Sequence, residues 1–463
     1  MESPAEAAER PHQAAEPIDT PADAPPRTFW GEPLGRLLAV ALALFAVAAT
    51  IVTATALRVP GISVFDETTH VDYAYQVAHG HIPDRGSHIS PEIRAEAACR
   101  GPAINPDTPL TSCGKPLVGA GSQNYNFGHP PLYYAITGVL ARAANYVIPG
   151  PHFITFARLV GVLWLFAGML VVYLALRRFR VRWTYAAGGA LLLALTPALY
   201  YYDGFVTNDA AVPLAGSAAV LVLARVVVDG KLGWRLPALL AALAAATKIL
   251  NALPFLAIAV ILGAMAFTGR RADPVRTRQL LKLAVGMIGG VLVVYLGWTV
   301  FQNFRGDPNW VNPIAGISSQ AVHGAPFDEL FSTSFSGINQ LSSGYVPAPL
   351  ANDFLSALLR LWGPLSVAAI GAVLATHERW SPRFVLASAT TLGVLSFPLA
   401  VEIQTYVSSG KYFPLVIPRY GMSFIPLLLA GMALAAEDRR LKKSFAAFIA
   451  CCLAVALFTV FRA

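Results

Sequence analysis

Two carboxylates stand side by side directly after the first apolar run of the sequence. Asp66 and Glu67 begin a segment that also contains His70 and Asp72. If this segment is helical, Asp66 and His70 share one face, because residues four apart are neighbours on a helix. A helix cap would explain Asp66, but it does not explain the other three. We therefore predict Asp66 and Glu67 as catalytic residues, since a positioned carboxylate can act as a general base, with His70 and Asp72 as substrate-binding residues.

A second polar segment, residues 125–134, contains a double proline. His129 comes directly before Pro130 and Pro131, and Tyr133 follows them. Prolines restrict the backbone, so His129 would be held rigidly near the same surface as Asp66. The aromatic residues of this segment fit an interfacial aromatic belt equally well, and both interpretations stay open at this point.

The composition indicates which elements must position these residues. The 463 residues include 34 Lys+Arg and 26 Asp+Glu, so 13% are charged, whereas 56% are hydrophobic. Soluble domains carry about 25% charged residues, and the mean hydropathy here is +0.55. This excludes a soluble enzyme, a disordered chain and a nucleic-acid binder. The net charge of +8 therefore has to be interpreted from how the basic residues are distributed between the two sides of a membrane.

A helix needs about 20 mostly apolar residues to cross a bilayer. Such runs predict an all-α polytopic membrane protein with about eleven transmembrane helices, at 34–57, 154–176, 184–202, 210–228, 236–250, 252–268, 279–301, 355–376, 384–402, 418–436 and 444–461. Residues 1–30 are rich in Ala, Pro, Glu and Asp and are predicted to be a disordered cytoplasmic tail. Residues 31–463 then form one transmembrane domain.

Orientation follows from the basic residues of the short loops, which favour the cytoplasm. With the N-terminus cytoplasmic, every dense Lys/Arg cluster lies on one side, provided that 131–148 lies on the outer surface as an interfacial helix. The long segments 58–153 and 302–354 then become outer loops, and loops of this length are usually functional. The acidic residues avoid the predicted span centres, so the chemistry is expected on the extracytoplasmic face.

The cysteines agree with this orientation. Cys99 and Cys113 lie in the first outer loop and are close enough in sequence to form a disulfide in an oxidising compartment, although two free loop cysteines are the alternative. Cys451 and Cys452 lie within an apolar run and are interpreted as small hydrophobic residues.

Further polar residues occur at the predicted outer ends of spans. Asn208 and Asp209 follow the third span, Lys248 separates the fifth and sixth, and Arg419 and Tyr420 begin a late helix. Alternatives exist here too: Asp209 could cap its helix, Lys248 could snorkel, and Arg419 could anchor to lipid phosphates.

Together these motifs resemble the GT-C superfamily of polyprenyl-phosphate-sugar-dependent integral membrane glycosyltransferases. The pattern is most similar to the branch that contains protein O-mannosyltransferases and lipid A aminoarabinose transferases. Two departures leave the donor sugar open, because Thr68, Thr69 and His70 follow the acidic pair and His129 replaces the lysine of the aminoarabinose transferases.

The resemblance implies a GT-C fold and inverting transfer of a sugar, such as mannose, arabinose or an amino sugar, from a polyprenyl-monophosphate donor. The acceptor would be a cell-envelope glycan, a lipoglycan or a protein. The donor phosphate would be bound by Lys248, Arg419, His129 and Arg158, and the substrates also by Tyr133, Asn208, Asp209 and Tyr420. No cofactor is expected. A divalent metal at Asp66, His70 and Asp209 is the less favoured alternative, because these residues lack a tight metal-binding spacing.

Two other functional classes remain as alternatives. A lipid or solute transporter or flippase would account for the many spans and for the interrupted helix near 248–254. An O-antigen-ligase-like or polymerase-like enzyme would use a diphosphate-linked donor and would not need Asp66 and Glu67.

Overall fold

The structure is a computed structural model of the protein. It describes residues 28–29, 32–63, 66–102, 113, 122–150, 152–310, 320–321, 350–412 and 418–462. The predicted disordered tail therefore lies outside the described residues except for Thr28–Phe29, and so does most of the predicted second outer loop. The chain forms two compact units, Met1–Val40 and Ala41–Ala463. The first contains the antiparallel strands β1 (Thr28–Phe29) and β2 (Glu32–Pro33) and the start of helix α1.

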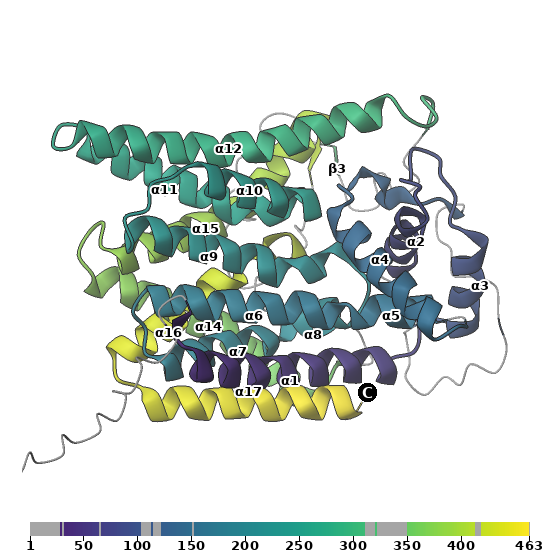
Figure 1. Cartoon of the computed structure of the whole chain (residues 1–463), viewed down its shortest axis with the longest axis horizontal. Helices are drawn as coiled ribbons and strands as arrows, with labels where there is room; N and C mark the ends of the chain where they lie inside the picture. Colours follow the sequence, from purple (N-terminus) through teal and green to yellow (C-terminus); the bar gives the residue numbers. More distant parts are fainter. Residues whose placement is uncertain are drawn as a thin grey trace, which may run out of the picture. The chain divides into compact units, whose positions relative to one another are not determined.

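The protein is an all-α polytopic membrane protein. Nine helical segments in the described part of the chain are long and apolar enough to cross a membrane: Leu34–Arg58 (α1), Phe153–Arg178 (α5 and α6), Asn208–Val227 (η3 and α9), Ile249–Gly269 (η4 and α11), Pro274–Asn303 (α12), Asp353–Thr376 (α14), Pro382–Tyr406 (within α15, Pro382–Ser409), Arg419–Asp438 (within η6, Pro418–Phe424, and α16, Ile425–Asp438) and Lys442–Arg462 (α17). Figure 1 shows several of them running side by side.

The predicted count of eleven spans is not confirmed, because two of the predicted runs form shorter helices. The run 184–202 is divided between α7 (Trp183–Ala194) and α8 (Pro197–Gly204). Pro197 starts the second helix because proline is tolerated in a first turn but breaks a helix interior. The run 236–250 contains α10 (Arg235–Thr247), which ends where Lys248 adopts an extended conformation. The second break places non-helical backbone at Lys248, one of the polar residues singled out above.

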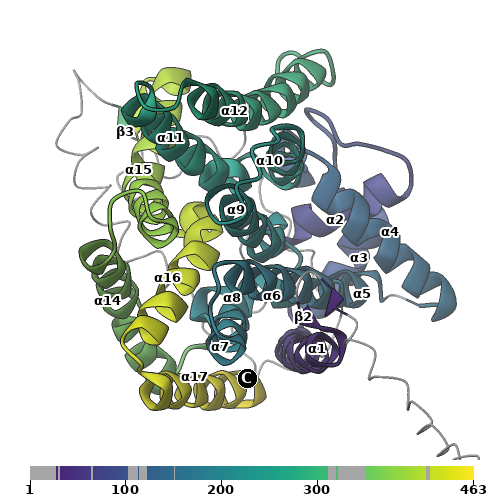
Figure 2. The same ribbon diagram turned by 60° about the vertical axis from the view of Figure 1, so that its left-hand side comes forward.

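The helices pack through closely approaching backbones. Helix α6 (Gly161–Arg178) packs against α9 (Val212–Val227), and α10 and α11 (Leu253–Gly269) both pack against α12. A Cβ atom at Gly168 of α6 would lie only 2.6 Å from Pro213 of α9, so a larger residue there would force the two helices apart. Figure 2 shows α14, α16 and α17 on the side away from α2–α4.

Short helices gather at one end of the bundle and carry the predicted first outer loop (Figure 1). They are α2 (Glu67–Ala78), α3 (Pro91–Arg100), the 3-10 turn η2 (Tyr125–Gly128), α4 (Leu132–Val147) and α5 (Phe153–Leu159). A disulfide joins Cys99 to Cys113, whereas Cys451 and Cys452 are free. Helix α4 occupies the predicted interfacial segment and exposes Val139 and Val147.

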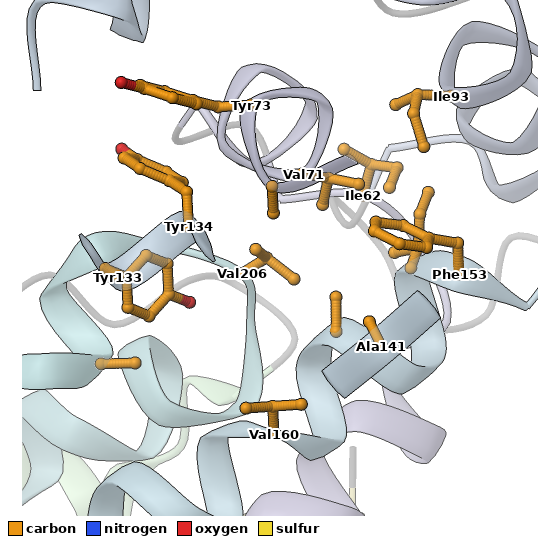
Figure 3. Close-up of a cluster of buried hydrophobic side chains, with 14 of the residues drawn as sticks. Ile62, Val71, Tyr73, Ile93, Tyr133, Tyr134, Ala141, Phe153, Val160 and Val206 are labelled. Atoms are coloured by element: carbon orange, nitrogen blue, oxygen red, sulfur yellow. The ribbon is translucent and has the colours of Figure 1, made fainter. Parts of the chain in front are cut away.

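A hydrophobic cluster holds these short helices together. Its members come mainly from α2, α3, α4, α5 and the end of η3 (Asn208–Ala211) and include Tyr73, Ile93, Tyr134 and Phe153. The rings of Tyr73 and Tyr134 stack with their centroids 3.9 Å apart, as Figure 3 shows. Because α2 begins next to Asp66, this packing determines where Asp66 lies relative to the membrane helices.

Candidate functional site

A polar cavity of about 440 Å³ lies where the short helices meet the membrane helices. Segments far apart in the sequence contribute to it: α2, the 125–129 segment, η3, the α10–η4 junction, α12, α15 and η6. Its lining residues are His70, Tyr125, Asn126, Gly128, His129, Asn208, Asp209, Lys248, Ile249, Leu250, Tyr295, Val401, Gln404, Thr405, Arg419 and Tyr420. Seven of the residues singled out in the sequence therefore surround one cavity.

Asp66 lies beside this cavity and is held by two of its lining residues. Its carboxylate accepts hydrogen bonds from the Tyr125 hydroxyl (2.6 Å) and from Arg419 Nη2 (3.3 Å). The side chain makes no capping hydrogen bond to α2, and the backbone adopts a left-handed conformation (φ 62°, ψ 7°). This conformation is costly for a residue other than glycine and occurs often at functional sites. The geometry thus removes the helix-cap interpretation of Asp66.

Glu67 points away from Asp66 into the protein and forms a buried ion pair with Arg158. The pair is bidentate, with Nε–Oε1 and Nη2–Oε2 distances of 2.7 Å each, and the side chains are 1% and 0% exposed. Glu67 also accepts hydrogen bonds from the backbone N–H groups of Ser63 and Val206.

The remaining donors of Arg158 are also used. Its Nη1 and Nη2 atoms donate to the carbonyl oxygens of Val59 (2.7 Å) and Gly61 (2.6 Å). Neither Glu67, predicted as a catalytic residue, nor Arg158, predicted to bind the donor phosphate, lines the cavity. Together they connect the end of α1, the start of α2, α5 and the segment before η3, and we assign them to positioning Asp66.

Asp209 and Lys248 form a second buried ion pair, and this pair does line the cavity. Lys248 reaches the site because its extended conformation (φ −165°, ψ 132°) separates α10 from η4 (Ile249–Ala252). Its ammonium lies 5.6 Å from the centre of the Tyr420 ring. The break in the apolar run at Lys248 therefore delivers a cation to the cavity rather than to the lipid surface.

Three buried polar atoms on the cavity wall have no hydrogen-bond partner among the residues that the structure describes. They are Asp209 Oδ2, Asn208 Nδ2 and Arg419 Nε. Buried polar groups are nearly always hydrogen-bonded, so each exception needs an explanation. The three residues line one cavity, so donor and acceptor atoms with unused hydrogen-bonding capacity lie close to the same space.

Two histidines face each other at the cavity and are both neutral near pH 7. The rings of His70 and His129 are stacked 6.1 Å apart, and His70 Nδ1 is hydrogen-bonded to the Tyr134 hydroxyl (2.8 Å). Burial, with additional repulsion from Lys248, lowers the pKa of His129 to about 3. Burial, with repulsion from His129 and Arg419, also lowers the pKa of His70 well below its usual value.

These pKa shifts predict a pH-dependent stability. Between about pH 6.5, the pKa of an unfolded histidine, and the lowered folded values, the unfolded chain binds protons that the folded chain does not. The free energy of unfolding therefore has its full value above pH 6.5. It falls as the pH decreases below 6.5, by up to about 1.4 kcal/mol per pH unit for each histidine. Thermal unfolding of the detergent-solubilised protein between pH 7 and 5 measures this. His129→Gln should flatten the profile and the exposed His81→Gln should not; identical slopes for all three proteins would contradict the assignment.

Two other predicted substrate-binding residues lie outside the cavity. Asp72 accepts hydrogen bonds from Ser90 (N, 2.8 Å; Oγ, 2.6 Å), Asn124 (2.7 Å) and Gln76 (2.6 Å), and burial raises its pKa. Tyr133 is 1% exposed and belongs to the hydrophobic cluster (Figure 3). The hydrogen-bond partners of the Asp72 carboxylate are all groups of the protein, and Tyr133 packs in the hydrophobic cluster. We therefore assign both residues to holding the short helices in place beside the cavity.

The sequence reasoning missed several lining residues, chiefly Tyr125, Asn126, Tyr295 and Gln404. Tyr125 and Asn126 lie in the polar segment 125–134, which had already been singled out in the sequence. Tyr295 occurs within the apolar run 279–301, and Gln404 lies two residues beyond the end of the run 384–402, so hydropathy singled out neither residue. Within the described ranges, no group of three or more His, Cys, Asp or Glu residues could hold a metal ion.

No protein-family model matches the sequence, and no curated protein matches it. Among solved structures, the fold is similar to ArnT from Cupriavidus metallidurans in the apo state, with 16% identity, a TM-score of 0.44 and coverage of 89% of this chain and 61% of that chain. ArnT bound to undecaprenyl phosphate matches with 16% identity, a TM-score of 0.42 and coverage of 87% and 60%. This chain thus spans less than two thirds of the length of ArnT.

Proposed function

We propose that the protein is an inverting glycosyltransferase that moves a sugar from a polyprenyl-monophosphate donor to a hydroxyl of a cell-envelope glycan, lipid or protein on the extracytoplasmic face. The observation that carries this proposal is a polar cavity among apolar helices that is lined by two cations, Lys248 and Arg419, with the carboxylate of Asp66 beside it and hydrogen-bonded to Arg419. A lipid-linked phosphate requires such a site, because its headgroup is anionic and its tail is apolar.

In the proposed reaction, Asp66 acts as the general base. It takes the proton of the acceptor hydroxyl while the hydroxyl oxygen bonds to the anomeric carbon of the donor sugar. The bond from that carbon to the phosphate oxygen breaks, and its electron pair stays on the phosphate. A single displacement of this kind inverts the anomeric centre. Tyr125 and Arg419 hold the carboxylate in place before the acceptor arrives.

The leaving lipid phosphate gains negative charge, and cations placed beforehand stabilise that charge. Lys248 and Arg419 are assigned this role because both line the cavity. The neutral His129 can still donate one hydrogen bond to a phosphate oxygen. Asn208 and Asp209 line the cavity, and each has a buried polar atom without a partner among the described residues; both are assigned to the sugar hydroxyls, with His70 and Tyr420 completing the wall. No metal or other cofactor takes part in this proposal.

Lys248→Met tests the phosphate assignment. We expect kcat with a polyprenyl-monophosphate donor to fall about 100- to 1,000-fold, as when one stabilising group of a transition state is removed, with a smaller change in KM. Lys282→Met removes an equivalent charge from the exposed surface of α12 and should leave both constants unchanged. A Lys248→Met enzyme that is folded by thermal unfolding and has normal kcat would refute the assignment.

A further inference from the structure

A second cavity, of about 430 Å³, lies at the other end of two helices that form the candidate site. Helix α9 follows η3, which carries Asp209, and has Arg225 in its last turn. Helix α10 starts at Arg235 and ends directly before Lys248. The 13 residues of α10 span about 20 Å at 1.5 Å per residue, so the two cavities lie at opposite ends of this apolar helix.

Three cations line this second cavity. Arg225 is partly buried, and Lys231 and Arg235 are exposed. None of the three side chains makes a hydrogen bond or ion pair with another residue in the described part of the chain. The one acidic residue between 222 and 237, Asp229, is paired with Arg178 instead. The cavity therefore concentrates positive charge without an internal counter-ion.

Its other lining residues are apolar, and two large ones among them are exposed. Trp234 and Leu236 are 47% and 41% exposed, and tryptophan is enriched where a membrane meets water. Trp234 also packs against Gly286 of α12, which holds the indole next to the cations. Basic residues are common on one side of any membrane protein, but that rule alone does not require a hollow that combines cations with an indole.

We propose that this cavity binds the phosphate group of an anionic phospholipid from the adjoining leaflet. Guanidinium groups bind phosphate oxygens through charge-assisted hydrogen bonds, and the exposed Trp234 and Leu236 would contact the glycerol and acyl region. A soluble phosphate would use the three cations but would gain nothing from these two apolar side chains. The proposal does not depend on the function assigned to the first cavity.

Native mass spectrometry of the full chain in detergent, titrated with phosphatidylglycerol or phosphatidylcholine, tests this proposal. We expect one tightly bound phosphatidylglycerol, and at least about tenfold weaker binding by a triple variant, R225Q/K231Q/R235Q, because each basic residue near a membrane surface adds to the attraction of anionic lipids. The matched control R271Q/R276Q/R278Q removes three exposed cations elsewhere and should bind normally. R225K/R235K, which keeps the charge, should retain most of the binding.

Several outcomes would overturn the proposal. One is equal phosphatidylglycerol binding by the two triple variants, and another is equal binding of the two lipids by the unmodified protein. Displacement of phosphatidylglycerol by millimolar inorganic phosphate would identify a soluble phosphate as the occupant instead. Loss of binding by the control as well would mean that only the overall charge of this face matters.

Discussion

Asp66→Asn should reduce sugar transfer about 100- to 10,000-fold, the usual contribution of a general base. The amide can keep both contacts that hold the carboxylate in the unmodified protein, because its oxygen can accept from Arg419 while its NH2 group donates to the Tyr125 hydroxyl oxygen, but it cannot take the acceptor proton. The expected defect is therefore in kcat, with the thermal unfolding midpoint close to that of the unmodified protein. The measurement is the initial rate of transfer from a polyprenyl-phosphate-linked sugar by purified protein.

Glu92→Gln is the matched control for this variant. Glu92 is an exposed carboxylate on α3, in the same group of short helices, and its removal should not change the rate. Near-normal transfer by Asp66→Asn would show that another group accepts the proton. A large fall in its unfolding midpoint would instead make Asp66 a structural residue.

Arg158→Met should destabilise the protein by about 3–5 kcal/mol, the usual effect of removing one partner of a buried ion pair. Glu67 would remain as a charge that is 1% exposed, and the carbonyl oxygens of Val59 and Gly61 would lose their donors. Chemical or thermal unfolding in a defined detergent measures this effect. Because Glu67 is adjacent to Asp66, activity should fall as well, even though Arg158 does not line the cavity.

The double variant Glu67→Gln/Arg158→Met separates an ion-pair effect from simple loss of packing. Neutralising both partners removes the unpaired buried charge, so the double variant should be more stable than Arg158→Met alone. Full stability of Arg158→Met combined with selective loss of donor binding would support the original prediction, that Arg158 binds phosphate. Equal stability of the single and double variants would contradict the buried-charge explanation.

The membrane architecture could largely be predicted from the sequence, because hydropathy alone identifies segments that need lipid. Each of the eleven apolar runs is mostly helical where the structure describes it. The count failed where local backbone chemistry interrupts a run: Pro197 begins a new helix within one, and Lys248 interrupts another. Hydropathy averaged over about 20 residues does not register such single-residue breaks.

The site was only partly predictable, because adjacency in sequence does not determine where side chains point. Asp66 and Glu67 are neighbours, but the left-handed conformation of Asp66 lets its carboxylate face Arg419, while Glu67 faces Arg158. Arg158 and Arg419 also look alike in the sequence, as single arginines near span ends. Only the fold shows that the first is fully paired in the interior and that the second lines a cavity.

The most direct test of the proposed function follows a doubly labelled polyprenyl-monophosphate sugar in proteoliposomes that also contain a cell-envelope acceptor fraction. We expect the sugar label to appear on the acceptor together with one equivalent of polyprenyl phosphate, and both products to disappear with Asp66→Asn. Movement of the intact donor across the bilayer, with the bond between sugar and phosphate unbroken, would contradict the assignment and identify a transporter.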